Sequence, residues 1–231
     1  MNRFYVKLGI VFVTVALAAF TPRYFAPLVG GDESIRLALH LHGATGFAWL
    51  VLYAVQSQLV HARSTRLHMQ LGVSSVLVAP ILFASGVLVS LENFVDLRAA
   101  ASPGANPSLL INLSDMAMFA TLFVLGWTQR TSTESHRHWM TLTSVVLMNA
   151  AFFRVIAFAT GVPVIGIFSA PLVTIAMLAL LVIRDRKLHD APHRGLLRAS
   201  IAIGVIHVLR IPIGLSPLWR PIADLTHRQL T

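Results

Sequence analysis

Long apolar stretches alternate with short polar connections along the whole chain. We distinguish seven apolar runs of about 20 residues, the length that crosses the hydrocarbon core of a bilayer as a helix. Open strands cannot satisfy their backbone groups in lipid, and the alternating pattern of a membrane β-barrel is absent. The pattern therefore predicts an all-α fold, a polytopic membrane helix bundle of about seven transmembrane helices. The runs are 4–21, 37–60, 69–91, 109–128, 140–160, 165–183 and 197–215.

The order of these runs predicts one integral membrane domain over residues 1–231, in which a first helix precedes three helical hairpins. Helix 4–21 is expected to be an uncleaved signal anchor, because no small-x-small cleavage site follows it. The last run contains Pro212 and several charged or polar residues, so it could cross the membrane or lie at its interface. We favour the crossing, because Ala199 to Ile206 is uniformly apolar. The hairpins span 37–91, 109–160 and 165–215.

Composition and charge agree with a bilayer as the solvent. Only 12% of the residues are charged, against about 25% in soluble domains, and the mean hydropathy is +0.74. Basic residues gather before the first run and in the hairpin turns, which predicts a cytoplasmic amino terminus for a multi-pass protein of the cell's inner (cytoplasmic) membrane. The net charge of +9 comes mainly from this bias, and no basic domain exists that could bind nucleic acid. The chain has no cysteine, so disulfides and thiolate metal sites are excluded.

The hairpin turns are rich in histidine. Thr65 and Ser135 are natural N-caps, and each is followed three residues later by a histidine, His68 or His138. A first helical turn disfavours imidazolium and so favours the neutral ring that binds metals. We therefore expect His68 and His138 to converge at the cytoplasmic side and to hold a haem or a metal ion, although both could equally be solvated turn residues. His193 follows Pro192, which suits the first position of the last helix.

A second polar group lies in the outer half of the predicted bundle. His40 and His42 point about 200° apart on one helix, so one site can use only one of them. His42 is the better candidate, because Gly43 and Gly46 next to it permit the close approach of a helix or a flat macrocycle.

The intramembrane charges of this outer half are Asp115 and Arg154. Each would be costly in lipid, so both are expected to face the bundle interior, and a structural ion pair between them is the simplest interpretation. His207 and Arg210 of the last run lie at a comparable depth.

The two levels of polar residues resemble the layout of transmembrane b-type cytochromes, in which histidines near both faces ligate haems. A closer resemblance rests on His42 and Trp49 in an H-x6-W pattern followed by glutamine, on R-L-H-M-Q-L-G (66–72) and on S-H-R-H-W-M (135–140). These segments resemble a family of uncharacterised bacterial integral membrane proteins with L-H-x-x-L-G and H-R-x-W-M motifs. The chain departs from that family at Met69-Gln70, where two arginines are usual. The resemblance implies the fold and singles out His42, His68 and His138, but it implies no activity.

Four functions remain open at this point. The first is b-type haem electron transfer with His68 and His138 as ligands, nearby arginines against the propionates and a quinol or redox partner at the inner interface. C-x-x-C-H is absent, so the haem would not be attached covalently. The second is a transporter or channel with a polar path through His42, Asp115 and Arg154. The third is an enzyme with a histidine-bound non-haem metal. The fourth is an assembly or scaffold subunit, as a homo-oligomer or within a membrane complex.

Overall fold

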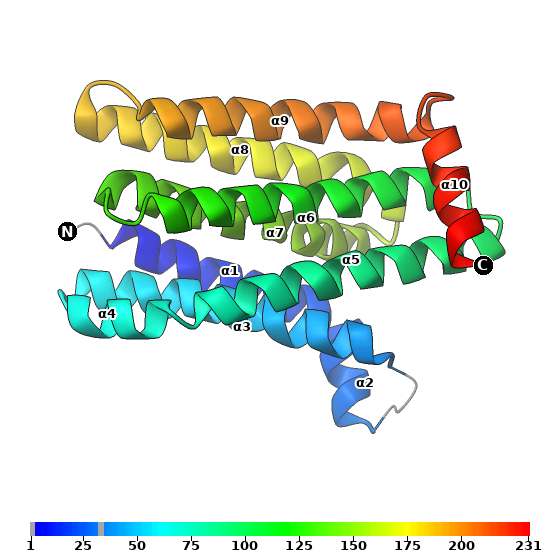
Figure 1. Ribbon diagram of the computed structural model, residues 1–231, viewed down its shortest axis with the longest axis horizontal. Coiled ribbons are helices and arrows are strands. Elements are labelled where there is room, and N and C mark those ends of the chain that lie inside the picture. Colours follow the sequence, from blue (N-terminus) through cyan, green and yellow to red (C-terminus); the bar gives the residue numbers. More distant parts are fainter. Residues whose placement is uncertain (1–2, 32–34) are drawn as a thin grey trace.

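The computed structural model describes residues 3–31 and 35–231, and within these ranges the chain folds entirely into helices. The long helices lie side by side as one bundle, with the two termini at opposite ends (Figure 1). Six helical segments are long and apolar enough to cross a membrane, α4 and α5 counting together as one. The described helices are α1 (Phe4–Phe20), η1 (Thr21–Phe25), α2 (Ala26–Val29), α3 (Leu37–His61), α4 (Thr65–Gly72), α5 (Ser75–Ala99), α6 (Ala105–Thr128), α7 (Thr133–Thr160), α8 (Pro163–His189), α9 (Arg194–Leu215) and α10 (Arg220–Leu230).

The prediction of an all-helical membrane bundle is confirmed, with six apolar helices of sufficient length for crossing. The first predicted run forms α1, whose 17 residues make it shorter than the other six. It nevertheless packs along α3 and α7 as part of the bundle. The third predicted run is divided by a turn at Val73–Ser74. There the hydroxyls of Ser74 and Ser75 donate to the carbonyls of Leu71 and Gly72, so they compete with the backbone ladder.

The three hairpin turns lie at the end of the bundle that holds the amino terminus, here called the N end (Figure 1). All three predicted helix starts are wrong by one to three residues. Helix α4 is preceded by the N-cap Ser64, so Thr65 is already its first residue. Helix α7 follows the N-cap Ser132, so His138 lies in the second turn rather than the first. At α9 the N-cap is His193 itself, whose ring Nδ1 accepts the Leu196 N–H at 3.4 Å.

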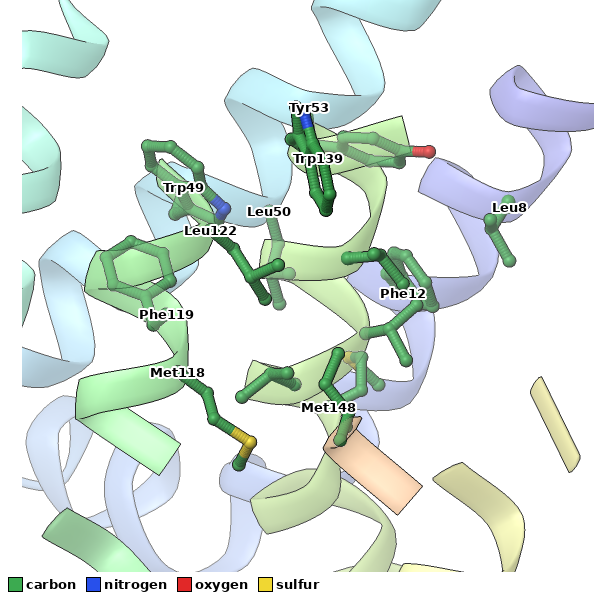
Figure 2. Packing of buried hydrophobic residues seen from close by; sticks show 14 of the residues in the cluster. Leu8, Phe12, Trp49, Leu50, Tyr53, Met118, Phe119, Leu122, Trp139 and Met148 are labelled. Atoms are coloured by element: carbon green, nitrogen blue, oxygen red, sulfur yellow. The ribbon is translucent and has the colours of Figure 1, made fainter. Parts of the chain in front are cut away.

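Helix α7 is the centre of the bundle, packed against α1, α3, α6, α8 and α9. Trp139 and Met148 of α7 lie in the same core as Trp49 of α3 and Phe119 of α6 (Figure 2). The Trp49 and Phe119 rings meet edge to face with centroids 5.0 Å apart. The buried Trp49 Nε1–H donates to Thr143 of α7 at 3.2 Å, so the core also satisfies its polar atoms across helices.

The sequence did not predict the last helix, α10, which crosses the opposite end of the bundle (the C end, Figure 1). Asp224 of α10 forms an ion pair with Arg98 at the end of α5. Just before α10, the Trp219 Nε1–H donates to the Asn106 carbonyl of α6 at 3.0 Å. Helix α10 therefore fastens the end of α9 to the α5–α6 turn.

Helices α6 and α9 approach most closely at Gly214, where a Cβ atom would lie 2.6 Å from Pro107 Cα. We expect Gly214→Ala to force the two backbones apart and to lower the unfolding free energy by about 1–3 kcal/mol. Gly204 is the matched control on the same helix, because its Cβ would meet only Ile175, at 3.9 Å. Gly204→Ala should be neutral or stabilising by up to about 1 kcal/mol. Thermal unfolding in detergent, followed by tryptophan fluorescence, measures both; equal melting temperatures would contradict the predicted close approach.

Candidate functional site

A buried cluster of charged and polar side chains lies in the half of the bundle toward the C end. We call it the Asp115 cluster: Asp115 of α6, Asn149 of α7, and His207 and Arg210 of α9. Asp115 Oδ1 accepts from Arg210 Nη1 at 2.5 Å, and its Oδ2 accepts from Asn149 Nδ2 at 3.3 Å. His207 Nε2 lies 4.0 Å from Asp115 Oδ1. His207 and Arg210, three residues apart, share one face of α9 and so reach the same carboxylate.

The Asp115 cluster is closed to water but not fully paired. His207 is 0% exposed and Arg210 3% exposed. His207 Nδ1 lies 2.9 Å from the Ile203 carbonyl, so this nitrogen must carry the proton and Nε2 holds the lone pair. Among the described residues, His207 Nε2, Arg210 Nε and Asn149 Oδ1 have no hydrogen-bond partner. Each buried polar atom without a partner destabilises the folded protein unless a water or a mobile proton satisfies it.

The expected pairing of Asp115 with Arg154 is corrected by this geometry. The Arg154 guanidinium lies over the Phe20 ring of α1, with Cζ 4.5 Å from the centroid, and Nη1 donates to the Ala150 carbonyl. Asn149, which contacts Asp115, is five residues earlier on α7, a rotation of about 140° at 100° per residue. Arg154 is therefore turned toward α1, and α9 supplies the cation for Asp115.

His40 and His42 lie on different sides of α3, as their spacing predicts. His40 faces Tyr24, with ring centroids 5.9 Å apart. The Tyr24 ring also fills the space beside Gly43, where a Cβ would lie 2.8 Å from Tyr24 Cζ. Gly43 therefore makes room for the Tyr24 ring, rather than for a neighbouring helix or a flat macrocycle. His42 packs where α3, α5 and α6 meet, and a Cβ added to Gly86 would lie 3.0 Å from His42 Cε1.

A second buried cluster lies at the N end, where α7, α8 and α9 meet. We call it the Asp185 cluster: Asp185, His138, His193 and Ser135. Asp185 Oδ1 lies 3.1 Å from His138 Nε2, and Oδ2 accepts the backbone N–H of His193 at 2.7 Å. The rings of His138 and His193 have centroids 5.1 Å apart. His193 Nε2 lies 3.3 Å from Ser135 Oγ.

The protonation pattern of the Asp185 cluster argues against a serine nucleophile. His193 Nδ1 accepts a backbone N–H, so the neutral ring carries its proton on Nε2 and donates it to Ser135. A base must instead accept the serine proton. His138 donates its Nε2 proton to Asp185, and its buried Nδ1 has no partner in the described part of the chain. This cluster can orient and relay protons, but it does not activate Ser135.

The structure does not pair His68 with His138. His68 of α4 faces His136, with ring centroids 6.2 Å apart, whereas His138 faces His193 and Asp185. Residues 136 and 138 point about 200° apart on α7, so only one of them can face α4. His136 is the histidine that begins the H-R-x-W-M motif, and the sequence interpretation passed over it.

The residues present fit a haem or metal poorly. His138 Nε2 is already hydrogen-bonded to Asp185. The His138 ring also lies beside His193 rather than opposite His68. No group of three or more His, Cys, Asp or Glu side chains in the described ranges converges enough to hold a metal ion. The assignment of His42, His68 and His138 as ligands therefore stays a prediction without geometric support.

One polar residue of α9, Ser200, continues the line between the two clusters. On α9, His193, Ser200 and His207 recur every seven residues, a spacing that keeps them on one face. On α7, Ser144 lies between His138 and Asn149 in the chain, but it is rotated by about 120° from the first and about 140° from the second, so it points away from both. Ser144 and Ser200 are both buried, and within the described chain neither hydroxyl has a hydrogen-bond partner. The seven-residue spacing is the sequence signal that could have linked the two clusters.

The sequence matches no protein-family model, and comparison with curated proteins and with solved structures finds no match. The resemblance of its histidine motifs to a membrane-protein family therefore stays a prediction. The functional argument rests on the geometry of the two clusters.

Proposed function

We propose that the chain is a multi-pass protein of the bacterial inner membrane, with its N end in the cytoplasm and α1 as a seventh crossing. The charge distribution supports this orientation. Acidic residues are paired at the C end, where Arg36 contacts Glu92 and Asp96. Basic residues gather at the N end: Arg3, Lys7, Arg63, Arg66, Arg130, Arg137, Arg184, Arg186, Lys187, Arg194 and Arg198.

Its function, in this proposal, is proton transport through the bundle interior. The observation that carries it is the set of buried polar atoms without partners in the two clusters and at Ser200 between them. His193 and His207 are 14 residues apart, about 21 Å along α9, and Ser200 lies midway. Intramembrane ionisable groups facing a bundle interior are typical of proton relays and transport paths. Waters bridging these atoms would complete a hydrogen-bonded chain.

Asp115 is the gating group of the proposed path. Its carboxylate holds Arg210, and through it α9, against α6. A proton arriving through His207 would neutralise Asp115 and remove its attraction for Arg210. The α6–α9 contact would then weaken, which is a two-state change driven by one proton. In this mechanism His207 Nε2, 4.0 Å away, is the last relay before the carboxylate.

Proton uptake by proteoliposomes tests the proposal. We expect vesicles with the wild-type protein to acidify under a potassium-diffusion potential, reported by an entrapped pH-sensitive dye. Asp115→Asn should reduce the rate to that of protein-free vesicles, because an amide does not titrate. The matched control is Asp96→Asn, which removes an exposed carboxylate at the C end and should leave uptake unchanged. Uptake by Asp115→Asn at the wild-type rate would refute the path.

The competing proposal, a histidine-bound b-type haem, has a separate readout. It would give the purified wild-type protein a Soret peak and a reduced α-band that His138→Ala loses. That result, together with vesicles that take up no protons, would replace the transport proposal by electron transfer.

A further inference from the structure

Two arginines from different helices lie against the same aromatic ring at the N end of the bundle. Arg184 of α8 has its Cζ 5.0 Å from the Tyr5 ring centroid of α1, and Arg137 of α7 has its Cζ at 5.3 Å. Arg184 also lies 4.3 Å over the Phe4 ring, and its Nη1 donates to the Tyr5 hydroxyl at 3.4 Å. The first turn of α1 thus forms an aromatic platform against which two guanidinium groups lie, each within 5.3 Å of the centroid of the Tyr5 ring.

The positive charge of this pair is only partly compensated. The nearest carboxylate to Arg137 is Asp185, with Oδ1 4.0 Å from Nη2, and that carboxylate already accepts from His138 and His193. Arg184 has no carboxylate within 4.0 Å in the described part of the chain. Two nitrogens of Arg137, Nε and Nη2, are buried without a hydrogen-bond partner there. Two cations on one aromatic ring, with no carboxylate of the described residues closer than 4.0 Å to either, call for an anion.

The depth of Arg137 and Arg184 in the bundle indicates which kind of anion they would bind. Arg184 lies five residues before the end of α8, about 8 Å along the helix. This is the depth of the headgroup region just outside the hydrocarbon core. Guanidinium groups bind phosphate through paired N–H donors, and the aromatic platform offers apolar surface beside them. We propose that Arg137, Arg184 and Tyr5 form a binding site for the phosphate of an anionic phospholipid at the N end.

This site lies apart from the Asp115 cluster, and Arg137 is 4.0 Å from Asp185 at the N end of the proposed proton path. The test below measures lipid binding and does not depend on proton uptake. Its specificity comes from two arginines held by one ring. The general attraction of a basic surface for anionic lipid would come equally from every arginine at that end. The distinction can be tested, because Arg186 and Arg194 are exposed arginines at the same end.

Native mass spectrometry of the purified protein with added phosphatidylglycerol tests the site. We expect the wild type to retain bound phosphatidylglycerol in preference to phosphatidylcholine. Arg137→Gln with Arg184→Gln should lower the apparent affinity for phosphatidylglycerol about tenfold or more. Arg186→Gln with Arg194→Gln, which removes the same charge, should change it less than about twofold. Equal losses in the two double variants, or no preference for phosphatidylglycerol in the wild type, would overturn the proposal.

Two further measurements separate the proposed site from a general charge effect and from a site for free phosphate. Arg137→Lys with Arg184→Lys keeps the charge but removes the planar donor fork, so binding should fall below the wild type even if the glutamine variant fails to fold. Wild-type affinity in this lysine variant would show that charge alone suffices and would overturn the site. Inorganic phosphate at millimolar concentration should not displace the lipid. Displacement would identify a site for free phosphate and so contradict a lipid site.

Discussion

Replacing Asp115 by alanine is expected to lower the unfolding free energy by about 3–5 kcal/mol, because Arg210 would be left buried without its counter-ion. Asp115 holds Arg210 at 2.5 Å, and Arg210 is 3% exposed, so water cannot replace the lost carboxylate. The melting temperature in detergent should fall by about 2–4 °C per kcal/mol. Thermal unfolding followed by tryptophan fluorescence measures the change.

The double variant Asp115→Leu with Arg210→Met is the control for this prediction. It removes both charges and fills the space with apolar side chains, so it should recover much of the loss caused by Asp115→Ala. If the double variant is less stable than the wild type by the sum of the losses in Asp115→Leu alone and Arg210→Met alone, the two residues do not interact and the described ion pair is wrong.

The second large effect is expected at Asp185. Alanine there leaves two donors without an acceptor, the buried His138 Nε2–H and the half-buried His193 backbone N–H. At about 1–3 kcal/mol for each unsatisfied donor, the loss should be about 2–6 kcal/mol. Loss of the Asp185 acceptor also frees the N-cap residue of α9, so the α8–α9 turn should become more open to protease.

Asp224→Ala provides the comparison for Asp185→Ala. Asp224 also pairs with an arginine, Arg98, but its side chain is 37% exposed. Surface ion pairs contribute about 1 kcal/mol or less, so its removal should change the melting temperature little. Melting temperatures and limited proteolysis of the two variants measure the difference. Similar losses at Asp185 and Asp224 would mean that the Asp185 cluster is solvated rather than buried.

The candidate sites were predictable only in part. Asp115, His138 and His207 were recognisable as costly polar residues within or beside apolar runs, and all three are buried. Asp185 was not among the predicted residues, because it lies between Arg184 and Arg186 in a basic hairpin turn. Nothing in the sequence shows that the carboxylate, rather than either neighbouring arginine, points into the bundle.

The sequence by itself determined the class of structure. Six helical segments follow from apolar runs long enough to cross a bilayer, and each helix satisfies its own backbone. Helix formation and the length of an apolar run depend on residues close together in the chain, so both can be predicted from the sequence alone.

Only the tertiary structure decided which polar groups meet. Asp115 meets Arg210 rather than Arg154, and His68 meets His136 rather than His138. These pairings depend on the rotation of each helix about its axis and on which helices are neighbours. The membrane helices are apolar on all sides, so no polar face shows which side is turned to lipid and which to the interior. That choice is made by packing between distant segments, and the position of α9 beside α6 and α7 settles it.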